Sequence, residues 1–575
     1  GLGRHGWISF TVDADADDER WEIIREWVRA SYTLVAPKAL ARIVGSRTAT
    51  PRTRELSWLP QPRKFTRSAV GLASAPGPNA VRPNRAQILQ GEPMQGLMQD
   101  WPLVLPHFFD RAERLFADKH VATNGPEGIQ RMSYGDWAAR TRKLGGVLDA
   151  LGISEAGRVG TFAWNTGRHL ELWFGVPCTG RVLHTLNIRL FPEQLTYVVN
   201  HAEDEVIFVD QSLLGLIAPL VPTFETVRHL VVMPDVPGEL PELDGGPEVH
   251  EYETLLAAAD PVTFHVDDEH RAASMCYTSG TTGHPKGVVY SHRSTWLHTM
   301  GAMQADNLGA RESDTILPVV PMFHANAWGL AHAAVACGAD LVMPGADLSA
   351  PTLAGLIESE RVTIAAGVPT IWMGVLPELD GRDVSSLRAI PCGGSAVPKV
   401  LSEGFREKIG MPILQAWGMT ETSPIASVCR IKSTLDLSDE EAADLRTTVG
   451  QVVTGVDFRV VGPEGEQPWD GESSGELQVA GPWIAASYYN DERSPDSFTD
   501  DGWLRTGDVA TVDPHGYIRL VDRTKDVIKS GGEWISSVEL ENEIMAHPKV
   551  TEAAVIGLPH ERWGERPLAC VVATD

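Results

Sequence analysis

The strongest constraint on the fold is an alternation of short apolar runs with helical patterns, which continues from Met98 onward. The runs 206–209, 229–233, 340–343 and 362–366 have strand-like composition and lie between segments with helical periodicity. Because parallel strands need crossover helices, this alternation predicts an α/β fold with parallel-rich sheets covered by helices. Functional side chains in such folds gather in the loops beyond the carboxyl ends of the strands.

One such loop follows the apolar run 272–277 and has the sequence Tyr-Thr-Ser-Gly-Thr-Thr-Gly-His-Pro-Lys-Gly over residues 277–287. Hydroxyl and glycine amide groups donate hydrogen bonds to phosphate oxygens, and a lysine adds a positive charge. The loop is not the common P-loop, which ends in Gly-Lys-Ser/Thr. A polar surface turn is the alternative. The candidate phosphate-binding residues are Thr278, Ser279, Gly280, Thr281, Thr282, Gly283 and Lys286.

The net charge of the chain bears on which class of molecule it binds. Lys and Arg number 49 against 76 Asp and Glu, which gives a formal net charge of −27. Because phosphate backbones attract basic faces, this acidity argues against nucleic acid as the main partner. It is compatible with ATP or coenzyme A, since one loop can be positive on an acidic protein.

The spacing of the cysteines indicates a reducing compartment, and the hydropathy bears on whether the chain crosses a membrane. The 6 cysteines are far apart, and no CxxC or Cys/His ligand spacing is present, which argues against a zinc site. The pattern is typical of free, buried thiols, so a cytoplasmic location is expected. No apolar run is long enough to span a bilayer. A hydrophobic substrate would therefore be reached from water or from a membrane surface, so peripheral membrane contact is possible. A homodimer is also possible.

Three further segments carry recognisable motifs. They are Gln-Ala-Trp-Gly-Met-Thr-Glu-Thr at 415–422, Trp-Leu-Arg-Thr-Gly-Asp at 503–508 and Val-Asp-Arg-Thr-Lys-Asp-Val-Ile-Lys-Ser-Gly-Gly-Glu at 521–533. Together with the glycine-rich loop 277–287 they resemble the adenylate-forming (AMP-binding) superfamily. This family includes acyl-CoA synthetases, firefly luciferase and the adenylation domains of peptide synthetases. The resemblance runs in order from about Met98 to the end of the chain.

The resemblance implies a domain organisation. Residues 94–522 would form the large adenylate-forming domain, and residues 523–575 would be part of a small C-terminal α+β domain that is truncated here. Residues 46–93 are rich in Arg and Pro and are expected to be a disordered linker, with a basic arm as the alternative. Residues 1–45 resemble the tail of a YjbR-like domain and are interpreted as a fragment or fusion remnant. All of residues 1–93 are expected to be dispensable for chemistry.

The resemblance also implies roles for individual residues. Trp417, at a position where the family usually has tyrosine, would stack on adenine, with Gly418 beside it. Gly393, Gly394 and Ser395 would form the adenine-side loop. Asp508 and Arg523 would bind ribose, and Lys525 would be the hinge. Thr278 and Glu421 would hold Mg²⁺, since hard oxygen ligands suit this ion. The candidate catalytic residues are Thr420 at the α-phosphate, Glu421, and Lys529 in the thioester-forming conformation.

The segment Pro-Met-Phe-His-Ala-Asn-Ala-Trp at 321–328 is the best clue to the substrate. It resembles the medium- and long-chain fatty acyl-CoA synthetases, in which His324 would border the acyl pocket and Trp328 would gate it. A core histidine and a core tryptophan are the structural alternatives.

The implied function is an ATP-dependent fatty acid–CoA ligase that uses ATP, Mg²⁺ and coenzyme A. It would form acyl-AMP with release of pyrophosphate, and then the acyl-CoA thioester. The alternatives are an aryl or luciferase-like acid–CoA ligase, and a nucleotide- and acyl-binding protein with impaired catalysis. The binding protein is an alternative because the family's C-terminal lysine motif does not follow Lys529 in this sequence.

Overall fold

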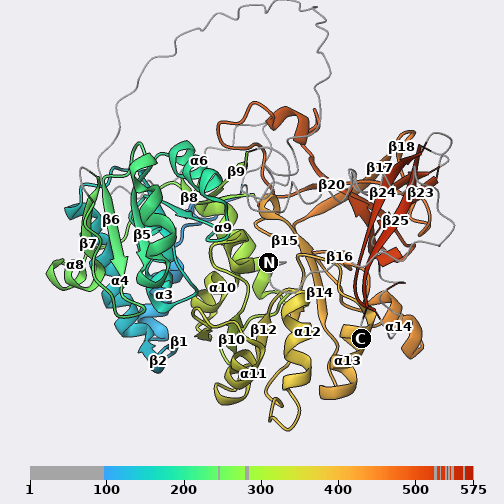
Figure 1. Cartoon of the computed structure of the whole chain (residues 1–575), viewed down its shortest axis with the longest axis horizontal. Coiled ribbons are helices and arrows are strands. Elements are labelled where there is room, and N and C mark those ends of the chain that lie inside the picture. The colour runs from blue at the N-terminus through green and yellow to red at the C-terminus, as the bar shows by residue number, and fades with distance from the viewer. Residues whose placement is uncertain are drawn as a thin grey trace, which may run out of the picture. The chain divides into compact units, whose positions relative to one another are not determined.

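The computed structural model of the chain describes residues 96–243, 246–278, 284–523, 528–530, 533–537, 540–541, 544, 550–560 and 564–573. The predicted fragment 1–45 and linker 46–93 lie outside the described residues. The chain divides into one unit of residues 1–100 and a second of residues 101–575, and every element below belongs to the second (Figure 1).

A seven-stranded sheet carries the glycine-rich loop. Its order is β7-β6-β5-β3-β4-β8-β9, parallel except for the β8–β9 pair. Its last two strands flank the glycine-rich loop; the sequence predicts the strand before the loop but not the one after it. The strands are β3 (Arg158–Phe162), β4 (Val182–Thr185), β5 (Asp204–Asp210), β6 (His229–Met233), β7 (Glu248–Glu251), β8 (Ala272–Tyr277) and β9 (Gly287–Ser291).

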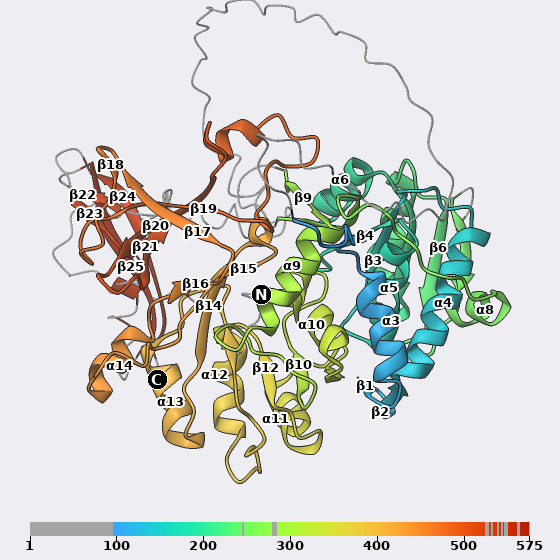
Figure 2. The same ribbon diagram turned by 180° about the vertical axis from the view of Figure 1, so that it is seen from behind.

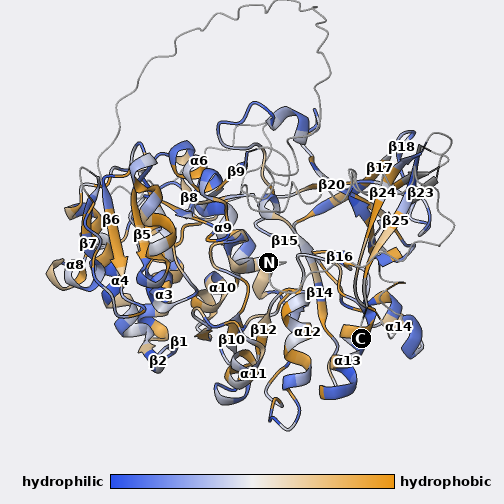
Figure 3. Cartoon of the chain, in the orientation of Figure 1, coloured by the Kyte–Doolittle hydropathy of each residue, from blue (hydrophilic) through white to orange (hydrophobic). Residues whose placement is uncertain are grey.

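Alternate residues of the central strands enter two different cores. Val206 and Phe208 of β5 pack in one cluster, whereas Ile207 and Val209 pack in another. β6 alternates in the same way over residues 230–233 and is mostly hydrophobic (Figure 3). Both faces of this sheet are therefore buried, as expected for parallel strands joined by crossover helices.

Helices cover these faces. On one side α3, α4 and α5 lie next to one another, as the view from behind shows (Figure 2). The helices of this region are α3 (Pro106–Leu115), α4 (Tyr134–Ala150), α5 (Gly167–Cys178), α6 (Pro192–Ala202), α7 (Leu214–Ile217), α8 (Tyr252–Ala258) and α9 (His292–Met303). α4 begins at the cap residue Ser133, whose hydroxyl accepts from the Asp136 amide.

A five-stranded sheet follows, in the order β12-β10-β11-β1-β2, parallel except for the β1–β2 hairpin. It is built from β1 (His120–Gly125), β2 (Gly128–Ser133), β10 (Thr315–Pro318), β11 (Asp340–Met343) and β12 (Ile364–Ala366). Its helices are α10 (Leu330–Cys337), α11 (Ala350–Ser359), α12 (Pro369–Glu378) and α13 (Lys399–Ile409).

Two further sheets carry the adenine and ribose motifs. One has the order β13-β14-β15-β16, with β13 (Pro391–Cys392), β14 (Leu414–Gly418), β15 (Ile425–Val428) and β16 (Gln451–Val452). The other is antiparallel, in the order β18-β17-β19-β20-β21, with β17 (Asp457–Gly462), β18 (Gly465–Glu466), β19 (Gly475–Ala480), β20 (Leu504–Val512) and β21 (Ile518–Arg523). The short helix α14 (Asp439–Leu445) precedes β16.

The C-terminal segment forms an antiparallel sheet of its own, in the order β23-β22-β25-β24. Its strands are β22 (Ile528–Ser530), β23 (Glu533–Ile535), β24 (Val550–His560) and β25 (Gly564–Ala573).

The predicted α/β class and the four predicted strand runs are confirmed, although β12 begins at Ile364, later than the predicted residue 362. Trp417 and Gly418 lie inside the end of β14, whereas the sequence placed them just after a strand. Among the described residues, no helix is long and apolar enough to cross a membrane.

Candidate active site

Three of the predicted motifs meet at one small pocket of about 60 Å³. His324 and Trp328 line one part, Gly393 and Gly394 another, and β14 with the following turn supplies the rest. The complete lining is His324, Ala325, Trp328, Gly393, Gly394, Ala416, Trp417, Gly418, Met419, Thr420, Pro424 and Ile425.

The segment that carries Trp328 has an unusual backbone. Ala325, Asn326, Ala327 and Trp328 all have positive φ angles, of 42°, 52°, 45° and 56°, and Gly329 continues at 72°. A left-handed conformation costs about 1–2 kcal/mol for each residue with a side chain. Such strain persists only where the surroundings enforce it, and it concentrates at functional sites. The strained turn coincides with the segment that the sequence predicts to border the acyl pocket.

Two glycines allow neighbouring backbone segments to approach each other closely in the pocket wall. A Cβ on Gly393 would fall 2.4 Å from the Ala416 carbonyl oxygen and 3.7 Å from the Trp328 ring. A Cβ on Gly418 would fall 1.7 Å from the Pro424 carbonyl oxygen. These positions require glycine because no side-chain carbon fits there. Ser395, which the sequence groups with Gly393, is exposed and does not line this pocket.

Trp417 and the ribose-motif aspartate are joined directly. The Trp417 indole N–H donates to Asp508 Oδ2 at 2.9 Å, and Arg523 Nε lies 3.0 Å from Oδ1. Burial raises the pKa of Asp508, and the nearby Arg523 guanidinium opposes that rise. The hydrogen bond fixes the plane of the indole ring. It brings together two residues that the sequence placed in separate roles.

Glu421 is buried and connected to the glycine-rich loop through a tyrosine. The Tyr488 hydroxyl donates to Glu421 Oε1 at 2.5 Å, and Lys286 Nζ lies 4.3 Å from the centre of the Tyr488 ring. Burial raises the pKa of Glu421, and the Tyr488 hydrogen bond and the Lys286 charge oppose that rise. Lys286 also donates to the Ser497 hydroxyl at 3.0 Å.

The two ends of the glycine-rich loop are fastened to each other. The Thr278 amide donates to the Lys286 carbonyl at 2.9 Å, and the Lys286 amide donates to the Thr278 hydroxyl at 3.2 Å. Tyr290 on β9 donates to the Thr420 carbonyl at 2.7 Å, which ties this loop to the Thr420–Glu421 turn.

Several predicted residues cannot be placed. Ser279, Gly280, Thr281, Thr282 and Gly283 of the loop, and the hinge residue Lys525, lie outside the described residues. The backbone of Lys529 lies in β22, but its side chain is outside the described part.

Buried histidines support the pocket. Burial lowers the pKa of His324, with a smaller contribution from Arg189, so the imidazole is neutral at pH 7. Behind the left-handed turn, burial lowers the pKa of His298 to about 3, and its Nε2 accepts from the Ile425 amide at 3.2 Å. A Cβ on Gly329 would fall 2.5 Å from the His298 ring.

Two thiols lie next to these segments. Cys276 precedes the glycine-rich loop and contacts the Thr185 hydroxyl at 3.0 Å, and Cys392 precedes Gly393. Burial raises the pKa of both thiols. All 6 cysteines are free, as the sequence predicts.

Sequence reasoning missed Tyr488, Tyr290 and His298. Each of them holds a predicted site residue or the pocket wall through one hydrogen bond. None lies in a motif with a recognisable spacing, so only the folded arrangement assigns them.

The residues fit the groups that the motifs imply. Glu421 supplies a buried carboxylate oxygen, Thr278 supplies a hydroxyl, and Lys286 supplies a positive charge close to Glu421. Hard oxygen donors with a neighbouring cation suit a magnesium–triphosphate complex.

Comparison with known proteins agrees with this chemistry. Residues 108–489 match the AMP-binding enzyme family, and residues 539–575 match the AMP-binding enzyme C-terminal domain. The chain is 43% identical to the 3-methylmercaptopropionyl-CoA ligase of Ruegeria lacuscaerulensis, over 84% of this chain and 90% of that protein. It is 45% identical to the long-chain-fatty-acid–CoA ligase of Thermus thermophilus, over 84% and 89% of the two chains.

The fold matches solved structures as well. The crystal structure of an anthranilate CoA ligase in complex with anthranoyl-AMP superposes with a TM-score of 0.72 at 27% identity, covering 83% of this chain and 89% of that one. Family match, relatives and fold agree with a site built to hold ATP, Mg²⁺ and an acid. The chain therefore belongs to the AMP-binding enzyme family and is an AMP-forming acid–CoA ligase, with ATP, Mg²⁺ and coenzyme A as its cofactor and co-substrates.

Proposed function

We propose that this acid–CoA ligase activates unbranched aliphatic acids, with medium- to long-chain fatty acids preferred over aromatic acids. The observation that carries the proposal is the strained turn that presents His324 and Trp328 to the pocket beside Gly393. The relatives from Ruegeria and Thermus, which act on an unbranched thioether acid and on long-chain fatty acids, support the aliphatic class.

The pocket volume supports a gating role for Trp328. The pocket of about 60 Å³ is small, and the Trp328 ring lies against Gly393 at its wall. In this proposal the indole moves to admit an acyl chain.

The other residues position the reactants. The carboxylate of the acid attacks the α-phosphorus and pyrophosphate leaves; the thiol of coenzyme A then attacks the acyl carbonyl and AMP leaves. In this proposal Trp417 holds the adenine ring and Asp508 with Arg523 holds the ribose. Thr420 contacts the α-phosphate. Magnesium, held at Glu421 and Thr278, screens the charge of the phosphates when bound.

A short thioether acid is the second candidate substrate. The small pocket favours it, because such an acid needs less rearrangement of Trp328 than a fatty acid does. The Ruegeria relative acts on an acid of this kind.

A competition assay separates these candidates. ATP–pyrophosphate exchange is measured with linear acids from butyrate to palmitate, with 3-methylmercaptopropionate and with benzoate. The highest kcat/KM is expected for a medium- or long-chain fatty acid. A maximum at 3-methylmercaptopropionate would establish the second candidate, and a maximum at benzoate would overturn the aliphatic assignment.

Replacement of Trp328 tests whether this side chain controls entry to the acyl pocket. Trp328→Ala is expected to raise kcat/KM for branched acids relative to linear acids by about 10-fold, since one missing or added methylene is worth about 1–3 kcal/mol in a pocket. The control is Trp469→Ala, which removes an exposed tryptophan that stacks on Phe458. Equal selectivity in both variants would remove Trp328 from the acyl path.

A further inference from the structure

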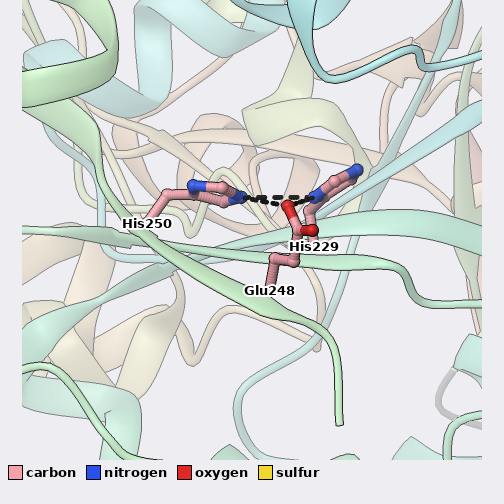
Figure 4. Close-up of side chains that lie close together, drawn as sticks. All are labelled: His229, Glu248 and His250. Carbon is pink, nitrogen blue, oxygen red and sulfur yellow. Dashed lines mark hydrogen bonds and ion pairs between the residues drawn. The ribbon is translucent and has the colours of Figure 1, made fainter.

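Three metal-ligating side chains meet at the edge of the seven-stranded sheet, on strands that take no part in the acid-activating site. His229 lies on β6, and Glu248 and His250 lie on its parallel neighbour β7. Glu248 and His250 are two residues apart and therefore share one face of β7. The register pairs His229 with Glu248 across the strands. Figure 4 shows the three side chains pointing toward one another.

The three ligand atoms form a compact triangle. His229 Nδ1 lies 3.2 Å from His250 Nε2, and Glu248 Oε2 lies 3.7 Å from each of these nitrogens. A point equidistant from the three atoms lies about 2.1 Å from each, which is the length of a zinc–nitrogen or zinc–oxygen bond.

A hydrogen bond between the two rings accounts for only one side of this triangle. One N–H···N bond would satisfy a single pair of nitrogens at 3.2 Å. It would leave the Glu248 oxygen at 3.7 Å, beyond hydrogen-bonding distance from both rings. A single ion at the centre accounts for all three positions at once.

The surroundings of His229 fit a metal ligand. Its ring is packed against the turn that contains Leu151 and Gly152, so it is held in one place beside its neighbours on β7. The adjacent carbonyl of Gly152 accepts from Arg228 at 2.9 Å, which holds this turn in place. The His229 side chain is 12% exposed, whereas that of Glu248 is 76% exposed, so one side of the triangle is open to water.

We propose that His229, Glu248 and His250 form a zinc-binding site that fastens the edge strand β7 to β6, with water as the fourth ligand. Two imidazoles and one carboxylate suit a borderline ion such as Zn²⁺, whereas Mg²⁺ and Ca²⁺ prefer oxygen ligands alone. The site is therefore chemically distinct from the magnesium site expected at Glu421. The ion would pin a four-residue edge strand, the part of a sheet most exposed to mispairing.

The test uses the full chain, stripped of metal with a chelator and then titrated with Zn²⁺ in a large excess of Mg²⁺. Isothermal titration calorimetry is expected to show one tight site per chain, and metal analysis after gel filtration is expected to find one zinc. Co²⁺ substitution should give the d–d absorption of a four-coordinate site. No tight zinc binding to the unmodified chain would overturn the proposal.

Variants assign the ligands. His250→Ala and His229→Ala are each expected to weaken zinc binding by about 100-fold or more, and Glu248→Gln, which keeps the shape of the side chain, by about 10-fold. His270→Ala removes an exposed histidine outside the cluster and serves as the matched control. Unchanged zinc affinity in the His250 and Glu248 variants would refute the assignment.

Thermal unfolding gives a readout besides affinity. Zn²⁺ should raise the Tm of the unmodified chain and of His270→Ala, because a ligand that binds only the folded state stabilises it. It should leave the Tm of His250→Ala unchanged. If the His229 variant does not fold, Glu248→Gln and His250→Ala, on the exposed edge strand, still decide the question. Exchange activity with the acid substrate should stay the same in Glu248→Gln.

Discussion

Trp417 shows how a single side chain can join two functions. Its ring faces the pocket, and its indole N–H donates to the buried Asp508. The Trp417→Phe variant keeps a flat ring but loses this hydrogen bond. Because a hydrogen bond to a charged group is worth about 1.5–3 kcal/mol, KM for ATP should rise by about 10-fold or more with little change in kcat.

Exchange kinetics as a function of ATP concentration check this prediction. Trp417→Ala removes the ring as well and should lose more, which separates stacking from hydrogen bonding. A Trp417→Phe variant with the KM of the unmodified enzyme would show that the bond to Asp508 does not position the nucleotide.

Glu421 provides a second prediction at the residue scale. Burial raises the pKa of this carboxyl, and its charged form is the one expected to bind Mg²⁺. Exchange activity should therefore fall on the acid side at a higher pH than it would for an exposed glutamate. Glu421→Gln keeps the shape but removes the charge, and it should slow exchange by about 100-fold and abolish this acid limb.

The measurement is the pH profile of exchange at several Mg²⁺ concentrations. Tyr488→Phe removes the hydroxyl that stabilises the charged carboxylate, so it should move the acid limb to higher pH. Identical profiles for the unmodified enzyme and Glu421→Gln would contradict a metal-binding role for Glu421.

At the scale of elements, the left-handed turn Ala325–Trp328 depends on the glycine that follows it. Gly329 has a φ of 72°, and a Cβ there would lie 2.5 Å from the His298 ring. Gly329→Ala should therefore lower the free energy of unfolding by about 2 kcal/mol or more and disturb the acyl pocket. Urea denaturation and the KM for the acid are the measurements.

A helical glycine provides the matched control. Gly355 lies within α11, and the nearest atom to an added Cβ is 3.9 Å away. Gly355→Ala should stabilise the protein by about 0.5–1 kcal/mol, because alanine is the better helix former. Equal effects of the two substitutions would show that the turn tolerates a side chain at residue 329.

The elements also show what the sequence can and cannot predict. Apolar periodicity is enough to find β5, β6 and β11, and the family resemblance is enough to single out Trp328, Gly393 and Trp417 as site residues, but their meeting at one pocket is seen only in the structure. The left-handed backbone at Ala325–Trp328 is not predictable, because alanine and tryptophan do not favour it. The zinc ligands escape a search for cysteine spacing, because His229 and His250 meet only through the pairing of β6 with β7.

At the scale of the whole molecule, buried histidines predict acid sensitivity. Burial lowers the pKa of His298 and His332 to about 3, and that of His169 and His292 to about 4. Below pH 6.5 the unfolded chain binds protons that the folded chain does not. The free energy of unfolding should therefore fall as the pH drops from 6.5 toward 4, by up to about 1.4 kcal/mol per pH unit for each histidine.

Urea unfolding between pH 7.5 and 5 measures this slope. His332 packs on Trp173 and Phe174, so His332→Leu removes one titrating group while keeping an apolar contact. His332→Asn removes the same group without the apolar contact. Both variants should show a shallower acid slope, whatever their stability at pH 7.5, and unchanged slopes would contradict the protonation argument.

The burial of the thiols has a consequence for an enzyme that makes an activated acyl group. An acyl-adenylate acylates any thiolate that it meets, and the thiolate is the reactive form of cysteine. The pKa of all 6 cysteines, including Cys276 and Cys392 beside the site, is raised by burial. Burial thus favours the protonated, less reactive form of these thiols, five of which are buried and one, Cys570, partly buried. We therefore expect transfer of the acyl group to the enzyme's own cysteines to be slow compared with transfer to the sulfur of coenzyme A.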